Sequence, residues 1–249
     1  MTRTNNSYKT IHKNEVDSTN AYAAEYITKN KVYNRVIIVA DNQPKGRGQR
    51  TNKWESEANK NLTISVIYEP TFIEACNQFL ISEVVSLGVC DYLSENINDV
   101  SIKWPNDIYI KDKKVAGILI EHVIKGSVLS SSICGIGLNV NQEKFLSDAP
   151  NPISMKQSSG FDYNLDRELQ KLINCIDKRY RQLEEAEYEK LGEDYHEVMY
   201  RREGFHKFKE NSEVFDAKIV CVNELGQLIL ENRREEQKIY NFKEIAFVV

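Results

Sequence analysis

The chain of 249 residues lacks any closely spaced pair of cysteines. Its cysteines are odd in number and scattered along the sequence: Cys76, Cys90, Cys134, Cys175 and Cys221. This pattern argues against a disulfide framework and predicts free thiols in a reducing compartment. No apolar run reaches the roughly 20 residues that span a bilayer, and the polar residues 1–13 lack the apolar core of a signal peptide. We therefore expect a cytoplasmic protein.

Signatures of several enzyme classes are also absent. The chain has no GxSxG motif and no CxxC pair, and its four histidines show no metal-ligand spacing. These absences argue against covalent nucleophilic catalysis and against a bound zinc ion. A formal net charge of -4 gives no overall attraction to nucleic acid or to an anionic membrane. We expect neither as a partner, and any anion site must be a local cluster of cations.

The pattern of apolar residues predicts an α+β fold. A helix is expected after Asp17-Ser18-Thr19, whose side chains can all cap it; further helices are expected over 72–93, from 165, and over 187–200. Strands are expected over 36–40, 62–68, 100–104, 108–110, 115–124 and 128–136. Their short connections, such as the polar turn Lys111–Lys114, favour antiparallel pairing. We predict a mixed, mostly antiparallel sheet backed by helices.

In the last part of the chain the predicted secondary structure changes from helices to strands. Beyond Gly204 the pattern turns to short strands, expected over 214–222, 227–230, 238–242 and 245–249, with a hairpin turn at Asn223–Gly226. We predict a catalytic domain over residues 1–203 and a small C-terminal β-barrel domain over residues 204–249.

The segment GRGQRTNKW, Gly46–Trp54, lies in a long polar connection. Its two glycines allow close approach of the backbone to a ligand, and Arg47, Arg50 and Lys53 bring positive charge, which suits a polyanion such as triphosphate. A solvated basic loop would have the same composition. The segment is not a Walker A loop, because it lacks the terminal GK[ST].

Two further segments combine polar residues with a strand. In KWPND, Trp104-Pro105 predicts a rigid turn from which Lys103, Asn106 and Asp107 project toward a phosphate, a base edge or a metal-bound water. A simple Asx-type turn between strands is the alternative. In KVAGILIE, Lys114 precedes a strand whose Gly117 leaves space for a ligand; the alternative is a lysine of a hairpin turn in solvent.

A fourth segment, GIGLNVN at Gly135–Asn141, has two glycines in an otherwise buried strand, which can also mark a bulge. Together with DSTN at Asp17–Asn20, GRGQRTNKWESEANKNLTIS and KWPNDIYIKDKKVAGILIE, it forms an ordered set that resembles the biotin–protein ligase family over nearly the whole chain. The resemblance implies an antiparallel-rich sheet with helices and a C-terminal barrel similar to Src-homology-3 domains. DSTN lies close to Met1, which is expected of monofunctional relatives without a DNA-binding domain.

The resemblance implies an enzyme that uses ATP and Mg²⁺ to convert biotin to biotinyl-5′-AMP and transfers biotin to a lysine of a biotin carboxyl carrier protein domain. Biotin-binding residues carried over by motif are Ser18, Thr19, Asn20, Gln43, Gly46, Arg47, Gly48, Gln49, Lys114, Gly117 and Gly135. Those for ATP or the adenylate are Arg47, Gly48, Arg50, Trp54, Asn106, Lys114 and Asn139. Catalytic roles fall to Lys114, Arg47, Asp107 and Lys103.

Within this set, Ser18, Thr19 and Gln43 are expected at the ureido end of biotin. Lys114 is expected to neutralise the biotin carboxylate and then the phosphate. No metal is expected to be bound permanently, since Mg²⁺ would arrive with the nucleotide and meet Asp107.

The chain departs from relatives at three positions: Gln49 stands where many have arginine, and Thr51 and Asn59 stand where glycine is frequent. A lipoate–protein ligase or octanoyl transferase is the alternative within the superfamily, and a non-catalytic biotin or nucleotide sensor is the alternative in another class. A homodimer is left open.

Overall fold

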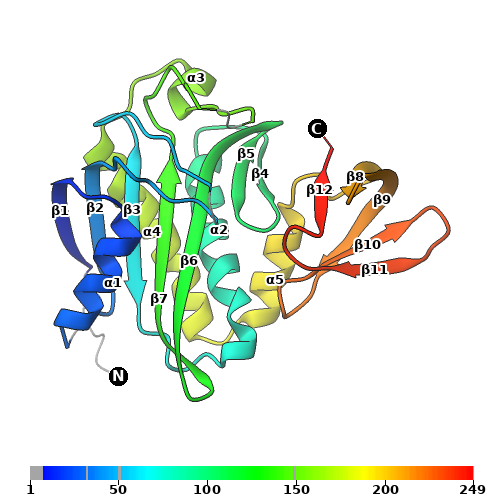
Figure 1. The fold of residues 1–249 in the computed structure, drawn as a ribbon, viewed down its shortest axis with the longest axis horizontal. Coiled ribbons are helices and arrows are strands. Elements are labelled where there is room, and N and C mark those ends of the chain that lie inside the picture. Colours follow the sequence, from blue (N-terminus) through cyan, green and yellow to red (C-terminus); the bar gives the residue numbers. More distant parts are fainter. Residues whose placement is uncertain (1–7, 32, 50–51, 148–149, 249) are drawn as a thin grey trace. The chain divides into compact units, whose positions relative to one another are not determined.

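The computed structural model of the chain describes residues 8–31, 33–49, 52–147 and 150–248. The chain divides into two compact units (Figure 1). The first comprises Met1–Ala75 and Lys113–Lys171, and the second comprises Cys76–Asp112 and Leu172–Val249. Each unit is therefore assembled from two separate stretches of sequence.

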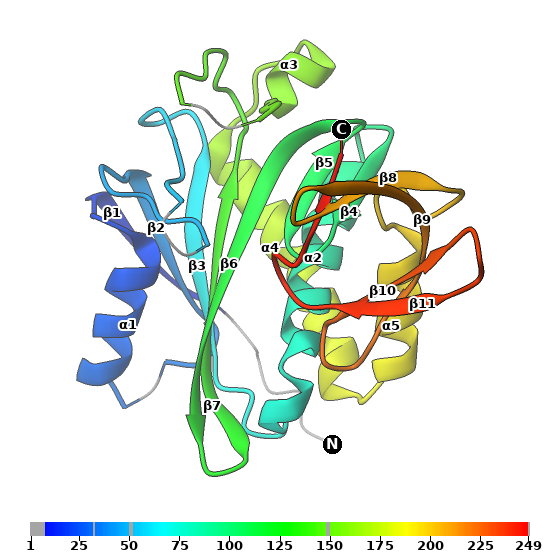
Figure 2. The ribbon, with the colours of Figure 1, turned by 45° about the vertical axis from the view of Figure 1, so that its right-hand side comes forward.

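The first unit is built on a sheet whose strands lie in the order β1-β2-β3-β7-β6. The strands are β1 Lys9–Glu15, β2 Val36–Asn42, β3 Leu62–Tyr68, β6 Lys113–Lys125 and β7 Val128–Leu138. β1 and β2 run parallel, whereas the β2–β3, β3–β7 and β6–β7 pairs are antiparallel. β6 and β7 form a long hairpin (Figure 2). The predicted mixed, mostly antiparallel sheet is confirmed, and β1 is an additional strand that its mostly exposed polar residues had concealed.

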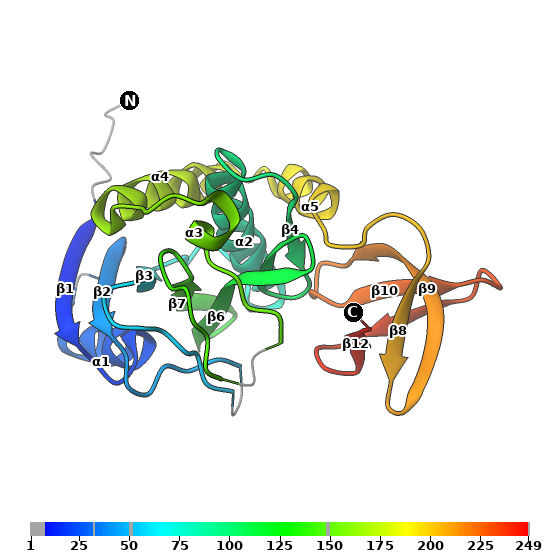
Figure 3. The ribbon, with the colours of Figure 1, turned by 90° about the horizontal axis from the view of Figure 1, so that it is seen from above.

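Helix α1, Thr19–Lys29, packs on β2, β3 and β7 of this unit (Figure 3). Its Ala23 is fully buried among apolar side chains of the sheet. The predicted capping by local side chains is wrong. Ser18 is the N-cap residue, but its side chain makes no capping hydrogen bond. Instead the Thr19 N–H donates to Gln43 Oε1 over 2.7 Å, so a residue from the long connection caps the helix.

The second unit contains most of the helical structure. Before the C-terminal sheet it contains α2 Phe79–Ser94, β4 Val100–Lys103, β5 Asp107–Ile110 and α5 Tyr188–Glu197. Two further helices, η1 Ala75–Asn77 and α4 Leu165–Glu184, begin in the first unit and end in the second. α2 is buried nearly all round and packs against β4, β5 and α5. The helix predicted from residue 72 thus begins only at Phe79. Gly192 lies within α5, and the break between α4 and α5 falls where Ala186 has a positive φ of 59°.

The C-terminal strands form a five-stranded antiparallel sheet in the order β11-β10-β9-β8-β12, with β8 and β9 as a curved hairpin (Figure 3). The strands are β8 His206–Glu210, β9 Glu213–Val222, β10 Leu228–Asn232, β11 Gln237–Tyr240 and β12 Ile245–Phe247. The sheet is consistent with a Src-homology-3-like domain. The predicted turn is confirmed by the hydrogen bond from Asn223 N to Gln227 O of 3.0 Å. The domain boundary at residues 203 and 204 stays a prediction.

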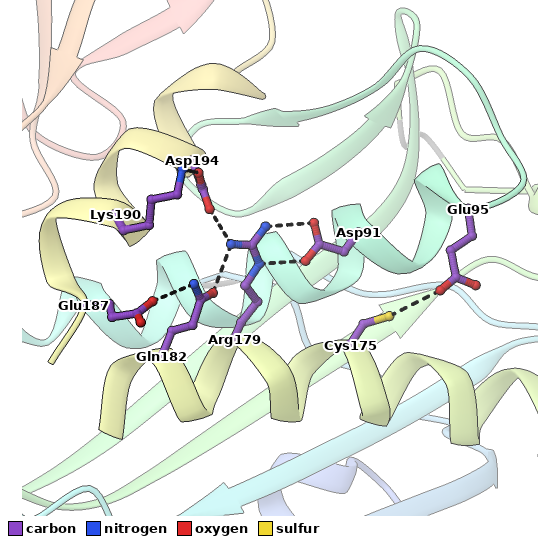
Figure 4. A network of polar contacts seen from close by, with 8 residues as sticks. All are labelled: Asp91, Glu95, Cys175, Arg179, Gln182, Glu187, Lys190 and Asp194. Carbon is purple, nitrogen blue, oxygen red and sulfur yellow. Dashed lines mark hydrogen bonds and ion pairs between the residues drawn. The ribbon is translucent and has the colours of Figure 1, made fainter. Parts of the chain in front are cut away.

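An arginine-centred network joins three helices of the second unit (Figure 4). Arg179 of α4 donates twice to Asp91 of α2, over 2.6 and 3.0 Å. It also donates to Asp194 of α5 over 2.5 Å and to Gln182 over 3.0 Å. Burial raises the pKa of Asp194, but hydrogen bonds from Lys190 and Arg179 outweigh burial and bring it below its ordinary value. A planar guanidinium suits such a bidentate contact, and we infer that the network aligns the helices.

The carboxyl group of Glu83 is also buried in this unit, but no cation offsets the effect of burial on its pKa. The Glu83 carboxyl lies in α2 near Gly192 and Tyr195 of α5, and within the described part of the chain its Oε2 atom has no hydrogen-bond partner. Burial raises the pKa of Glu83 from 4.5 to about 7. Between these two values the folded chain holds a proton that the unfolded chain has lost. The free energy of unfolding therefore falls as pH rises through this window, by about 3 kcal/mol in all.

We expect Glu83→Gln to remove this decline, because glutamine does not ionise. Urea unfolding measured from pH 5 to pH 8 should show a stability curve flatter than that of the unchanged protein. Glu189→Gln is the matched control, because Glu189 makes the same chemical change at an exposed position of α5. Parallel curves for the unchanged protein and Glu83→Gln would show that Glu83 does not titrate in this range.

None of the five cysteines forms a disulfide, as predicted. Burial raises the pKa of Cys90 to about 12, so this thiol stays protonated at neutral pH. Among the described residues, no helix is both long and apolar enough to cross a membrane.

Candidate functional site

The polar connection between β2 and β3 contains a small hairpin at its glycines. Trp54 N donates to Gly46 O over 3.0 Å, and Gly48 N donates to Asn52 O over 2.8 Å. A Cβ atom at Gly46 would lie 2.5 Å from the backbone oxygen of Trp54, so only glycine allows this approach. Asn52 N donates to Gln49 O over 3.2 Å. The connection therefore has local structure of its own.

The hairpin brings Trp54 onto a flat area of the sheet. Gly117 of β6 and Gly137 of β7 are paired across the strands. A Cβ atom at Gly137 would lie 2.3 Å from Cε2 of Trp54, and one at Gly117 would lie 3.0 Å from Cζ3. The indole therefore occupies the space beside Gly117 that was expected to hold biotin. Its Nε1 atom is buried and has no hydrogen-bond partner among the described residues.

Gly137 had no predicted role, although a signal for it exists. Side chains alternate across a strand, so Gly135 and Gly137 share one face of β7. The space over Gly135 is also taken: a Cβ atom there would lie 2.3 Å from Oδ1 of Asn20. We call Gly117, Gly135 and Gly137 the glycine bed.

Lys114 lies at the edge of the glycine bed and belongs to β6, so the predicted polar turn is shorter than Lys111–Lys114. Its backbone is held on a second strand-like segment: Lys114 N donates to Asn151 O over 2.8 Å, and Ile153 N donates to Lys114 O over 3.0 Å. Its Nζ atom lies 5.6 Å from the centre of the Trp54 ring. A lysine on a rigid strand holds its charge in a defined place, unlike one in a solvated turn.

Asn139 follows β7 and is hydrogen-bonded to both β6 and the segment around Ile153. Its backbone N donates to Val115 O over 2.9 Å, and its Nδ2 donates to Ile153 O over 3.1 Å. Its Oδ1 atom is buried and has no partner among the described residues. Asn139 therefore keeps one unused acceptor while its amide orientation is set by the protein.

The DSTN segment contributes a cluster of buried hydroxyl and amide groups. Ser18, Thr19 and Asn20 are each at most 5% exposed. Ser65 Oγ of β3 lies 2.8 Å from Thr19 Oγ1 and 2.7 Å from Asn20 Oδ1. Gln43 Oε1 accepts from Thr19 N. Ser65 was not among the predicted site residues, because one serine in an apolar strand carries no signal by itself.

Arg47 is paired with Glu121 of β6, the last residue of the KVAGILIE segment, for which the sequence predicted no role. The Nη2 atom of the Arg47 guanidinium lies 3.4 Å from Glu121 Oε2. The same carboxylate oxygen accepts from Asn20 Nδ2 over 2.7 Å. The predicted ligand-binding residue Arg50 and the departure Thr51 lie outside the described residues.

The other predicted site residues lie in the second unit, in the hairpin of β4 and β5. Lys103 and Asp107 are paired across this hairpin, with Asn106 in its turn. Lys103 Nζ donates to Tyr109 Oη over 2.9 Å. Trp104 Nε1 donates to Gly226 O over 3.0 Å, so this part of KWPND has a structural role toward the C-terminal sheet. The functional roles of Lys103, Asn106 and Asp107 stay predictions.

A polar clasp holds the second half of the long connection. Gln142 Oε1 accepts from Asn61 Nδ2 over 2.5 Å, while Glu55 accepts from the N–H groups of Leu146 and Ser147 over 2.8 Å each. Burial raises the pKa of Glu55, but hydrogen bonds from Ser147 and Leu146 bring it below the ordinary value. The clasp fixes the position at which the chain returns from the hairpin to β3.

The departure at Asn59 has a structural explanation. Its φ of 60° lies in the left-handed region, where glycine is most favourable and asparagine is tolerated. We expect Asn59→Ala to destabilise the protein by about 1 kcal/mol and Asn59→Gly to have little effect. Chemical denaturation of both variants tests this, and equal stability of the two would contradict it.

Comparison with known proteins places the chain in a family. Residues 14–139 match the model of the Biotin/lipoate A/B protein ligase family, and the chain belongs to this family. The chain is 32% identical to the bifunctional ligase/repressor BirA of Bacillus spizizenii over 69% of this chain and 53% of that protein. It is 29% identical to the biotin--[acetyl-CoA-carboxylase] ligase of Mycobacterium tuberculosis over 51% of this chain and 48% of that protein. The chain thus spans about half the length of these relatives.

A solved structure is similar over nearly the whole chain. The biotin protein ligase from Aquifex aeolicus in complex with biotin and ATP aligns with a TM-score of 0.79 and 27% identity, covering 96% of this chain and 98% of that one. The predicted fold class is thereby confirmed. Within the described residues, no group of three or more histidine, cysteine, aspartate or glutamate side chains is arranged to hold a metal ion.

Proposed function

We propose that this protein is an ATP-dependent biotin–protein ligase. In the first step the biotin carboxylate attacks the α-phosphorus of ATP, the bond to pyrophosphate breaks, and biotinyl-5′-AMP forms. In the second step a lysine amine of a biotin carboxyl carrier protein domain attacks the acyl carbon. The bond to AMP then breaks, and the amine loses a proton. The Mycobacterium tuberculosis relative, named for acetyl-CoA carboxylase, supports a carboxylase as the source of the carrier.

The observation that carries this proposal is the position of Lys114 beside the glycine bed. The first reaction step brings a carboxylate against a phosphate, so it needs fixed positive charge and alignment more than covalent chemistry. Lys114 supplies such a charge from a rigid strand, and its Nζ would lie 3.2 Å from a Cβ atom added at Gly117. Arg47 supplies a second cation from the hairpin.

Two other groups of the first unit fit an adenylate. The buried Oδ1 of Asn139 can accept a hydrogen bond from the amino group of adenine. The Trp54 ring offers a stacking surface for the base. The Mg²⁺ that accompanies ATP would supply further charge neutralisation, and Asp107 stays the predicted carboxylate for it.

Binding on the glycine bed requires the indole of Trp54 to move, because it fills the space beside Gly117 and Gly137. We expect the hairpin to rearrange with ligand and to close over the phosphate. Trypsin should then cut after Arg47 or Lys53 without ligand, and biotin with ATP should suppress the cleavage. Unchanged cleavage in the presence of both ligands would contradict an induced closure.

The decisive experiment for the function is biotin-dependent exchange of pyrophosphate into ATP, which needs no carrier protein. We expect exchange with biotin and none with lipoate or octanoate. Exchange with lipoate instead would identify a lipoate–protein ligase, and binding of biotin without exchange would identify a sensor. Transfer to a purified biotin carboxyl carrier domain then tests the second step.

A further inference from the structure

The predicted catalytic residue Lys103 lies against two aromatic side chains of the second unit. Its Nζ atom donates to Tyr109 Oη over 2.9 Å. The same Nζ atom lies 5.5 Å from the centre of the Phe247 ring, which is within the range of a cation–π contact. Tyr109 belongs to β5, whereas Phe247 belongs to β12 of the C-terminal sheet. Two strands that are far apart in the sequence therefore contact one ammonium group.

The Phe247 ring is held in place from several sides. Its centre lies 5.0 Å from that of Phe208, its partner in the pairing of β8 with β12, and 6.0 Å from that of Tyr200. Phe208 is fully buried. The backbone beside the ring is also fixed, because Val248 O accepts from Arg201 Nη1 over 2.6 Å. The ring therefore has a defined position on the C-terminal sheet.

The Tyr109 hydroxyl is equally well placed. The Tyr109 side chain is 3% exposed, and its ring centre lies 5.2 Å from that of Tyr200. Burial, and after it the negative charge of Asp107, raises the pKa of Tyr109, so its hydroxyl stays neutral and can accept from Lys103. Lys103 and Asp107 are paired across the hairpin of β4 and β5. The aromatic contacts thus hold the ammonium group near the carboxylate that is predicted to meet Mg²⁺.

The position of a lysine charge has a thermodynamic consequence. The ammonium group ends a flexible four-carbon stem, and ordering that stem for a phosphate costs conformational entropy. Contacts that order the stem beforehand remove this cost from binding. An aromatic face and a neutral hydroxyl attract the ammonium group without cancelling its charge. The charge therefore remains available to a phosphate.

We propose that Phe247 and Tyr109 are positioning residues: acting through Lys103, they hold its ammonium group in place for the phosphates of ATP. The C-terminal sheet thereby contributes an aromatic ring to the first reaction step. This inference rests on the proposed function and adds two residues to which the motifs gave no role. The competing explanation is that Lys103 only joins β12 to the β4–β5 hairpin, in which case its aromatic contacts affect stability and leave the reaction unchanged.

The main test is Phe247→Leu, which keeps an apolar side chain and removes the aromatic face. We expect the kcat/KM for ATP in biotin-dependent pyrophosphate exchange to fall about fivefold, with the KM for biotin unchanged. Phe215→Leu is the matched control, because Phe215 is also half-buried and packs on Phe208 of the same sheet. Phe247→Tyr restores an aromatic face and should keep the activity of the unchanged protein. Thermal unfolding of each variant gives an assay temperature at which all of them are folded.

A double-mutant cycle separates positioning from packing. Lys103→Met removes the charge and keeps the apolar stem. In this background Phe247→Leu should change kcat/KM by less than about twofold, because no ammonium group is left to position. Tyr109→Phe removes only the hydroxyl and should also lower kcat/KM about fivefold. Tyr200→Phe is its control, since it is the same chemical change at a hydroxyl that donates to Asp112 instead.

A spectroscopic readout needs no catalysis. The ring current of Phe247 should shift the ε-methylene protons of Lys103 upfield in protein with ¹³C-labelled lysine, and Lys103→Met identifies this signal by its loss. Phe247→Leu should move the signal toward that of an exposed lysine, whereas Phe215→Leu should not.

The inference fails if Phe247→Leu and Phe215→Leu have the same kcat/KM for ATP, or if Phe247→Leu has the same effect with and without the Lys103 ammonium group. Absence of exchange in the unchanged protein would instead reject the proposed function.

Discussion

Replacing Lys114 with alanine should reduce biotin-dependent pyrophosphate exchange by at least about 100-fold while the protein stays folded. Removing one partner of a desolvated charge pair costs roughly 2–5 kcal/mol, and each 1.4 kcal/mol corresponds to a factor of ten. The backbone of Lys114 is held by Asn151 and Ile153, and these bonds do not involve its side chain. Circular dichroism and thermal unfolding should therefore be nearly unchanged.

Lys113→Ala is the control for this prediction. Lys113 is the preceding residue of β6 and is exposed, so its loss removes the same charge without changing the glycine bed. We expect exchange within about twofold of the unchanged protein, as is usual for an exposed charge. Near-normal exchange in Lys114→Ala, or an equal loss in both variants, would remove the specific role assigned to Lys114.

Replacing Arg179 with methionine should destabilise the second unit by about 3 kcal/mol. The arginine side chain is 14% exposed, and the Asp194 and Asp91 side chains are 15% and 34% exposed. Without the guanidinium, these carboxylates lose a shared partner in a poorly hydrated place, which is costly for a buried charge. Methionine retains the apolar stem, so the change measures mainly the lost charge and hydrogen bonds.

The destabilisation should depend on pH in a defined direction. Hydrogen bonds hold the pKa of Asp194 below its ordinary value, so its contribution is present above the unfolded pKa and is lost as pH falls. The difference between the unchanged protein and Arg179→Met should therefore shrink under acid conditions. Lys178→Ala, at the exposed neighbouring position of α4, is the control and should unfold like the unchanged protein. A difference that is constant with pH would mean that packing, not charge, is what Arg179 contributes.

The start of α1 shows why local sequence was insufficient at the site. Asp17, Ser18 and Thr19 all carry capping side chains, and the position of the helix was correctly predicted from them. The actual cap comes from Gln43, which lies 24 positions away from Thr19. Because a single-sequence pattern contains no information about which loop returns to which helix, the capping partner could not be predicted.

For the glycine bed, the sequence predicted single residues but not their arrangement. Gly117 and Gly135 were singled out because glycine is unusual within a buried strand. The pairing of Gly117 with Gly137 depends on the register between β6 and β7. The sequence of either strand alone does not contain this register, so the glycine bed could not be predicted. Ser65 has ordinary surroundings in the sequence, and the contacts of Glu121 with Asn20 and Arg47 arise only in the tertiary structure.

By itself the sequence determined the elements and the chemistry available to the protein. Period and polarity predicted most strands and helices, and the order of the DSTN, GRGQRTNKW, KWPND, KVAGILIE and GIGLNVN segments indicated the family. Tertiary structure decided which of these groups meet. It put Lys114 on a strand instead of a turn, placed Trp54 over the glycine bed, and joined Thr19 to Glu121 through Ser65 and Asn20. The physical reason is that hydrogen-bond direction and close approach depend on atoms that only pairing of distant strands brings together.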